Sequence, residues 1–136
     1  MENRTVFDTN IWISYIIKSK YDELAVFVED KDVRFLRSAP SLTELQNVLS
    51  RKKFQKYEIN FDRTIAFYKN LTEFCETQAM FQDCPDPKDN FLFDLALQGN
   101  AKYLVSGDPD VLETPVTSKI LQVTKLRKFK EDFQIQ

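Results

Sequence analysis

Acidic residues carry most of the chemistry that this sequence offers, because the chain contains no histidine. Catalysis by Ser-His-Asp or Cys-His groups and the usual zinc sites are therefore excluded. The chain also has only two glycines and no glycine-rich phosphate loop. Four acids stand where strands are expected to end or helices to begin: Asp8, Glu44, Asp89 and Asp108.

Asp8 and Asp108 each follow a short apolar run. The residues before Asp8, TVF, are β-branched and aromatic, which is typical of a buried strand, and apolar residues recur at helical spacing directly after it. The run AKYLVSGD likewise ends in Asp108. Parallel strands would place both carboxylates at one edge of a sheet, which is where ligands bind in open α/β folds.

Glu44 and Asp89 are expected near the starts of helices. Ser41 is a plausible N-cap, and Glu44 follows it at capping-box spacing, in the first turn of that helix. Asp89 follows a Pro-Lys pair at the start of another helix. Each acid has a structural alternative, because aspartate, glutamate and serine are common in caps and turns. Helices that follow parallel strands begin at the same sheet edge, so all four acids are expected to converge.

Clustered carboxylates repel one another and raise each other's pKa unless a cation lies between them. Hard cations prefer oxygen ligands, so one or two Mg²⁺ or Mn²⁺ ions are the expected cofactors. Two such ions can activate a water and stabilise the leaving oxygen of a phosphodiester. Asn10 and Ser106 are expected to orient Asp8 from the second shell of ligands. Asp94 and Asp110 are possible extra acids, although Asp94 suits a solvated surface and Asp110 a turn or cap.

Strands and helices are expected to alternate along the chain, which indicates an α/β sandwich with a mainly parallel sheet. Strands are expected at 5–7, 33–38, 101–108 and 119–123, and helices at 10–19, 22–30, 39–54, 60–76, 90–100 and 124–133, with a loop at 83–90.

The composition suits one domain spanning 1–136, with 43% hydrophobic and 29% charged residues. The chain does not start with the pattern of a signal peptide, and no apolar run approaches the ~18 residues of a membrane span. Cys75 and Cys84 form no metal motif and fit free thiols in a reducing compartment. A cytoplasmic protein without a membrane partner is expected.

Two basic clusters are candidates for contact with nucleic acid. Arg51, Lys52 and Lys53, with Lys56 close by, follow the Glu44 helix. A second cluster in the tail is interleaved with apolar residues and comprises Lys125, Arg127, Lys128 and Lys130. Either could hold RNA phosphates, and the tail could meet an acidic partner instead. A solvated basic face is the structural alternative for both, and the net charge of −2 gives no global nucleic-acid footprint.

Taken in order, the motifs FDTNIWIS, SLTELQNVLSR and DPKDNFLFDLALQGNAKYLVSGDPDVL, with the basic-aromatic tail, resemble PIN-domain proteins. More narrowly, they resemble the toxin components of bacterial toxin–antitoxin pairs, relatives of the VapC ribonucleases. The resemblance implies a three-layer α/β/α sandwich, a Mg²⁺- or Mn²⁺-dependent endoribonuclease acting on RNA, a homodimer and an antitoxin partner.

Carried over by position, the resemblance implies that Asp8, Glu44, Asp89 and Asp108 bind metal and that one carboxylate assists the attacking water. Lys88 departs from the pattern, because this group often has another aspartate there. Asp94 departs too, since its position is often apolar or small.

Two other functions are open at this point. A PIN-like fold could serve as a catalytically silent RNA-binding or protein-interaction module. The FDTN segment also resembles the strand-end nucleophile of haloacid dehalogenase-type phosphotransfer enzymes. That family requires a second aspartate two residues later, where this chain has Asn10.

Overall fold

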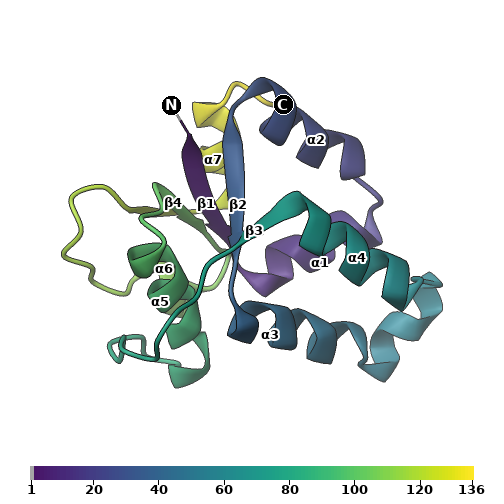
Figure 1. Cartoon of the computed structure of the whole chain (residues 1–136), viewed down its shortest axis with the longest axis horizontal. Helices are drawn as coiled ribbons and strands as arrows, with labels where there is room; N and C mark the ends of the chain where they lie inside the picture. Colours follow the sequence, from purple (N-terminus) through teal and green to yellow (C-terminus); the bar gives the residue numbers. More distant parts are fainter. Residues whose placement is uncertain (1) are drawn as a thin grey trace.

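A single five-stranded sheet forms the centre of the computed structural model (Figure 1). The structure describes residues 2–136, so Met1, the first residue of the expected domain, lies outside the described residues. All neighbouring strands are parallel, in the order β3-β2-β1-β4-β5. The strands are β1 (Asn3–Phe7), β2 (Val33–Arg37), β3 (Thr72–Phe74), β4 (Tyr103–Val105) and β5 (Gln122–Thr124).

Helices cover both faces of the sheet, which confirms the expected three-layer α/β/α sandwich (Figure 1). The helices are α1 (Thr9–Ile17), α2 (Tyr21–Asp30), α3 (Ala39–Leu49), α4 (Phe61–Leu71), α5 (Asn90–Gln98), α6 (Pro109–Leu112) and α7 (Leu126–Asp132), with 3₁₀ turns η1 (Lys52–Tyr57) and η2 (Pro87–Asp89). Buried residues of α5 and α6 pack on one face, and those of α1, α2, α3, α4 and α7 pack on the other. No helix within residues 2–136 combines the length and apolarity needed to span a bilayer.

Successive side chains of the central strands point to opposite faces of the sheet, so the interior has two separate hydrophobic cores. Phe7, Phe35 and Val105 belong to the core under α1, α2, α3, α4 and α7. Val6 and Leu36, each next to one of these residues in its strand, belong to the core under α5 and α6. Strands that are buried on both faces are expected in a parallel sheet covered by helices.

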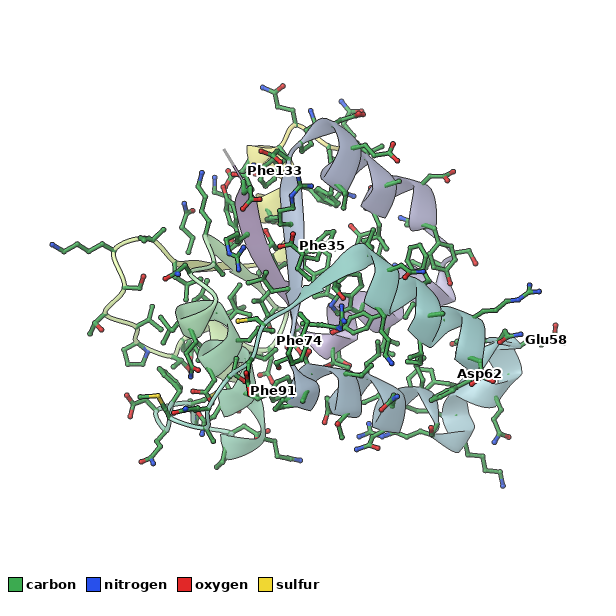
Figure 2. All side chains as sticks on the ribbon, viewed as in Figure 1. Phe35, Glu58, Asp62, Phe74, Phe91 and Phe133 are labelled. Carbon is green, nitrogen blue, oxygen red and sulfur yellow. The ribbon has the colours of Figure 1, made fainter. Side chains whose placement is uncertain are left out.

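An aromatic cluster fixes the larger core and docks the last helix. Phe129 of α7 is fully buried, and its ring centroid lies 5.1 Å from that of Phe27 and 5.0 Å from that of Tyr103. Phe35 of β2 belongs to the same cluster, and its ring centroid lies 4.7 Å from that of Phe7 (Figure 2). Glu58 lies at the far end of the molecule, on the connection between α3 and α4 (Figure 2).

The start of α3 corrects the expected cap. Ser38, not Ser41, is the N-cap residue. The Ser38 backbone N–H donates to Ser41 Oγ over 2.8 Å, and the Ser41 N–H donates to Ser38 Oγ over 3.3 Å. Two serines thus form the reciprocal box that was expected from Ser41 and Glu44. Glu44 consequently lies in the second turn of α3 rather than the first.

Two expected helices were too long. The helix expected at 39–54 ends at Leu49, because Arg51 is extended before η1 begins. The helix expected at 60–76 ends at Leu71, and Thr72–Phe74 pair with β2 as an edge strand. Arg37 donates from Nη1 to the carbonyl of Thr72 over 2.6 Å, and the Thr72 hydroxyl donates to the Tyr68 carbonyl over 2.6 Å. Tertiary contacts from β2 therefore end this amphipathic helix.

The remaining differences are at element ends. The last strand was expected at 119–123 and lies at Gln122–Thr124. The strand expected at 101–108 is confined to Tyr103–Val105. The short α6 was not expected at all. Its N-cap residue is Asp108, whose side chain accepts from the Asp110 N–H, and Pro109 is its first residue.

Truncation of Phe129 should therefore undock α7. We expect Phe129→Ala to lower the free energy of unfolding by about 3–5 kcal/mol, because a fully buried ring is lost. Phe74→Ala is the matched control, since the Phe74 ring is 59% exposed and the expected loss is below about 1 kcal/mol. Urea denaturation measures both. Equal losses in the two variants would contradict the packing described here.

Candidate functional site

The pairing of β1 with β4 brings Asp8 and Asp108 to the same edge of the sheet. Phe7 is in register with Val105, and the Asp8 N–H donates to the Val105 carbonyl over 2.9 Å. Asp8 follows Phe7 directly, and Asp108 follows Val105 after Ser106 and Gly107. The chain leaves β1 towards β2 on one side, and β4 lies on the other side. Such a reversal of strand order is where open α/β sheets bind ligands.

Ser106 joins the two aspartates. Its fully buried hydroxyl donates to Asp8 Oδ2 over 2.6 Å, and the Asp108 N–H donates to the same Ser106 Oγ over 3.0 Å. The backbone N–H groups of Asn10 and Thr9 also favour the charged form of Asp8 and oppose the rise in its pKa. Ser106, directly after β4, therefore holds the Asp8 side chain in place.

Asp89 reaches the same place from the start of α5, where it is the N-cap residue. Burial, followed by the charges of Asp8, Asp86 and Asp108, raises the pKa of Asp89 from 3.8 to about 7, and a hydrogen bond with the Asp108 side chain adds to the shift. Burial also raises the pKa of Asp8, against the opposing hydrogen bond from Ser106. The structure thus brings Asp8, Asp89 and Asp108 together, and their repulsion is partly relieved by a proton on Asp89.

The donor chemistry of these three residues suits a hard divalent cation, because every side chain offers carboxylate oxygens. A cation would replace the proton that Asp89 otherwise retains. Within residues 2–136, however, no three Asp, Glu, Cys or His side chains surround a common point closely enough to form a ready-made metal site. The three aspartates offer the right ligand atoms and lie near one another. Binding of a cation would have to bring their carboxylates closer together.

The hydrogen bonds and charge interactions that connect the three aspartates do not include Glu44. It is half-buried in the second turn of α3, a helix that packs against α1 and α5. The carboxylates that raise the pKa of Asp89 are Asp8, Asp86 and Asp108. The expected four-acid set therefore appears in this structure as three neighbouring aspartates, with Glu44 on an adjoining helix.

Asp94 and Asp110 each take part in hydrogen bonds that hold a loop or a turn in place. Asp94 is buried, not solvated, and its Oδ1 accepts from the N–H groups of Met80 and Phe81 over 3.0 and 2.8 Å. The expectation of a surface acid was wrong, because this carboxylate anchors the long loop before α5. The Asp110 N–H donates to Asp108 Oδ1 over 2.9 Å, which makes Asp110 part of the turn that shapes the Asp108 side chain.

An open pocket lies over the acids, lined by Asp8, Asn10, Ile11, Gly107 and Asp108. A Cβ added to Gly107 would meet no atom within 4 Å. Gly107 thus leaves room next to Asp108, where a side chain would take up space in the pocket.

The two basic clusters differ in their surroundings. Arg51, Lys52 and Lys53 are exposed at the start of η1. In the tail, three cations have acidic partners within the protein: Lys128 with Asp132 at 2.7 Å, Arg127 with Glu131 at 3.6 Å and Lys130 with Glu23 at 2.9 Å. The tail cluster is therefore less available to phosphates than its sequence suggests.

Asp86 is a residue of the site that sequence reasoning missed. Its side chain accepts from the Lys88 N–H over 3.1 Å and caps η2, and its charge contributes to the raised pKa of Asp89. The spacing in Asp-Pro-Lys-Asp was a usable signal, because an aspartate before proline commonly starts a turn.

The fold and the site define an α/β protein with an acidic pocket at the carboxyl end of a parallel sheet. A family model described as PIN domain matches residues 4–110. The chain belongs to the PIN domain family. This membership removes the haloacid dehalogenase alternative.

Solved structures support the same fold. The chain is similar to VapBC2 from Rickettsia felis, described as bound to a DNA fragment from their promoter, with 19% identity, a TM-score of 0.57 and coverage of 88% of this chain and 98% of that one. It is also similar to PAE2754 from Pyrobaculum aerophilum, with 12% identity, a TM-score of 0.63 and coverage of 98% and 90%. No curated protein sequence matches the chain.

The raised pKa of Asp89 makes stability depend on pH in a defined direction. An acid whose pKa is higher in the folded state stabilises the fold fully below its ordinary pKa of 3.8, and this contribution is lost as the pH rises through about 7. In EDTA, wild type should therefore lose stability relative to Asp89→Asn between about pH 4 and pH 7, measured by thermal unfolding. Parallel curves for the two proteins would contradict the proximity of Asp89 to the other acids.

Proposed function

We propose that this chain is a Mg²⁺- or Mn²⁺-dependent endoribonuclease, and that it is the toxin of a toxin–antitoxin pair. The observation that carries the proposal is the meeting of Asp8 and Asp108 at one open pocket, joined by the Ser106 hydroxyl. Asp89 lies near enough for the charges of both to raise its pKa. PIN domains are generally nucleases, and the chain belongs to that family. The likeness to VapBC2 supports the narrower toxin assignment.

The residues of the chain have separate roles in this proposal. Asp8, Asp89 and Asp108 would hold the cation, with Glu44 as a fourth carboxylate from α3. Ser106 keeps the Asp8 carboxylate oriented, and the turn at Asp110 does the same for Asp108. One carboxylate of the set accepts the proton of the attacking water. When bound, Mg²⁺ or Mn²⁺ supplies a water of lowered pKa and neutralises charge on the phosphodiester.

The partners follow from the same assignment. RNA is the substrate, an antitoxin protein is the inhibitor, and a homodimer in the cytoplasm is the expected form. Exposed Arg51, Lys52 and Lys53 are available for further contact with RNA.

Cleavage of a mixed single-stranded RNA panel with Mn²⁺, Mg²⁺ or EDTA tests the proposal. Asp8→Asn and Asp108→Asn should each reduce the rate of metal-dependent RNA cleavage by more than about 100-fold. Loss of a residue that only orients a metal ligand usually has a smaller effect. Asp62→Asn is the matched control, because Asp62 is exposed and lies far from the pocket (Figure 2). Its rate should equal that of wild type.

Glu44→Gln belongs in the same assay. A loss of cleavage rate as large as that of Asp8→Asn would support a site of four carboxylates. An unchanged rate would mean that the site consists of the three aspartates alone. If wild type neither cleaves RNA nor binds Mn²⁺, the nuclease proposal is wrong, and a silent RNA-binding or interaction module becomes the better account. The lack of a ready-made group of three metal ligands within residues 2–136 is the observation that favours that second candidate.

A further inference from the structure

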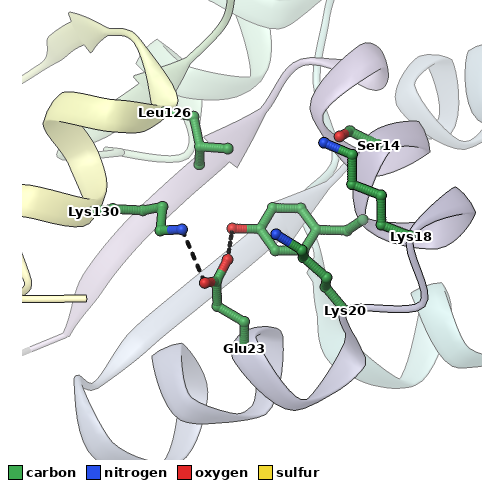
Figure 3. A pocket seen from close by; sticks show the side chains of 7 residues that line it. Ser14, Lys18, Lys20, Glu23, Leu126 and Lys130 are labelled. Atoms are coloured by element: carbon green, nitrogen blue, oxygen red, sulfur yellow. Dashed lines mark hydrogen bonds and ion pairs between the residues drawn. The ribbon is translucent and has the colours of Figure 1, made fainter. Parts of the chain in front are cut away.

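A basic groove lies between the end of α1 and the start of α7. We define the α1–α7 groove by Ser14, Lys18, Lys20, Leu126, Arg127 and Lys130, which line two adjoining pockets. Figure 3 shows Lys18 and Lys20 across the pocket from Leu126 and Lys130. The proposed nuclease chemistry uses none of these side chains.

Two cations of the groove are neutralised within the protein. Lys130 donates to Glu23 over 2.9 Å, and the same carboxylate accepts from the Tyr15 hydroxyl (Figure 3). Burial opposes the ionisation of Glu23, but the hydrogen bonds from Tyr15 and Lys130 outweigh it and lower the pKa of Glu23. Lys130 thus balances most of the charge of Glu23, with a smaller contribution from Lys20. Arg127 has Glu131 at 3.6 Å.

The surplus charge comes from Lys18 and Lys20. Both are exposed, and neither forms a salt bridge within residues 2–136, although the charge of Lys20 contributes to the lowered pKa of Glu23. Their backbone is fixed, because the Lys20 N–H donates to the Tyr15 carbonyl over 3.0 Å and Ser19 between them takes the left-handed conformation at φ 53°. The end of α1 therefore presents two exposed ammonium groups from a closed turn.

The acidic pocket and the α1–α7 groove are bordered by the same parts of the chain. On α1, Asn10 and Ile11 line the acidic pocket, and Ser14 and Lys18 follow at the three- and four-residue spacing that keeps side chains on one helix face. Residues 10 and 18 are about 12 Å apart along a helix.

On the opposite wall, β4 leads to β5. The Ser106 N–H donates to the Thr124 carbonyl over 3.0 Å, so the residue before Gly107 touches the strand that leads to Leu126. Gly107 lines the acidic pocket and Leu126 lines the groove. The ends of β4 and β5 therefore connect the lining of the acidic pocket with that of the groove.

We propose that the α1–α7 groove holds the phosphates of the single-stranded RNA whose scissile bond lies over Asp8 and Asp108. Lys18 and Lys20 are the direct phosphate contacts, and Lys130 positions α7 against α2 through Glu23. This inference rests on the proposed nuclease function and adds to it the path that the strand takes away from the acids. Basic residues next to an acidic site resolve an electrostatic problem, because the carboxylates alone repel the substrate.

The test is the salt dependence of RNA binding. Fluorescence anisotropy with a short labelled single-stranded RNA in EDTA, which prevents metal-dependent cleavage, compares wild type with Lys18→Gln/Lys20→Gln over a KCl series. Each phosphate contact on a single strand contributes about −0.7 to the slope of log K against log salt. The double variant should bind about tenfold or more weakly at low salt, with a slope shallower by about 1.4.

The matched control is Lys102→Gln/Lys119→Gln, which removes the same charge from exposed residues outside the groove. It should keep the wild-type slope. Equal slopes for the two double variants would overturn the groove proposal, while RNA cleavage by wild type would leave the nuclease function standing. If wild type neither binds nor cleaves RNA, the nuclease proposal falls and the groove proposal with it.

A polyglutamate peptide serves as the second probe, because an acidic protein segment is the competing occupant. A groove variant that loses affinity for polyglutamate and retains wild-type affinity for RNA would overturn the proposal. Loss of RNA affinity with the shallower slope supports it.

Discussion

The parallel pairing of β1 with β4 is the constraint on which the candidate site depends. It brings two acid-terminated strands to one sheet edge, and the buried Ser106 hydroxyl then links Asp8 to the backbone of Asp108. The two cores on either side of the sheet hold this pairing rigid, since Phe7 and Val6 point into opposite layers. The backbone that carries Asp8 and Asp108 is therefore held by well-packed strands, which is the support that a functional site requires.

Holding three carboxylates together has an energetic cost. The fold offsets part of it with hydrogen bonds to Asp8 and with a proton on Asp89. A cluster that is unfavourable without a cation is a common feature of sites selected for binding rather than for stability. Relief of this repulsion links metal binding to stability, because a cation that binds only the folded state stabilises it.

The sequence allowed a correct prediction of the fold class, because apolar periodicity and strand-end acids are local signals. It did not locate β3, since Thr72 ends α4 through a contact with Arg37 from a distant strand. Asp94 shows the same limit at the site. Its helical position suggested a surface acid, but the loop that folds back onto it supplies two backbone N–H donors. Pairings of this kind arise only after the chain has closed on itself, so no local pattern encodes them.

The most direct test of the central claim is a crystal structure of the protein grown with Mn²⁺ and measured at a wavelength where manganese scatters anomalously. The account predicts an anomalous peak within bonding distance of carboxylate oxygens from Asp8 and Asp108, with Asp89 turned towards it. The same map would show whether Glu44 reaches the ion from α3. A protein saturated with Mn²⁺ that shows no peak in this pocket, or a peak bound only by other residues, would contradict the account.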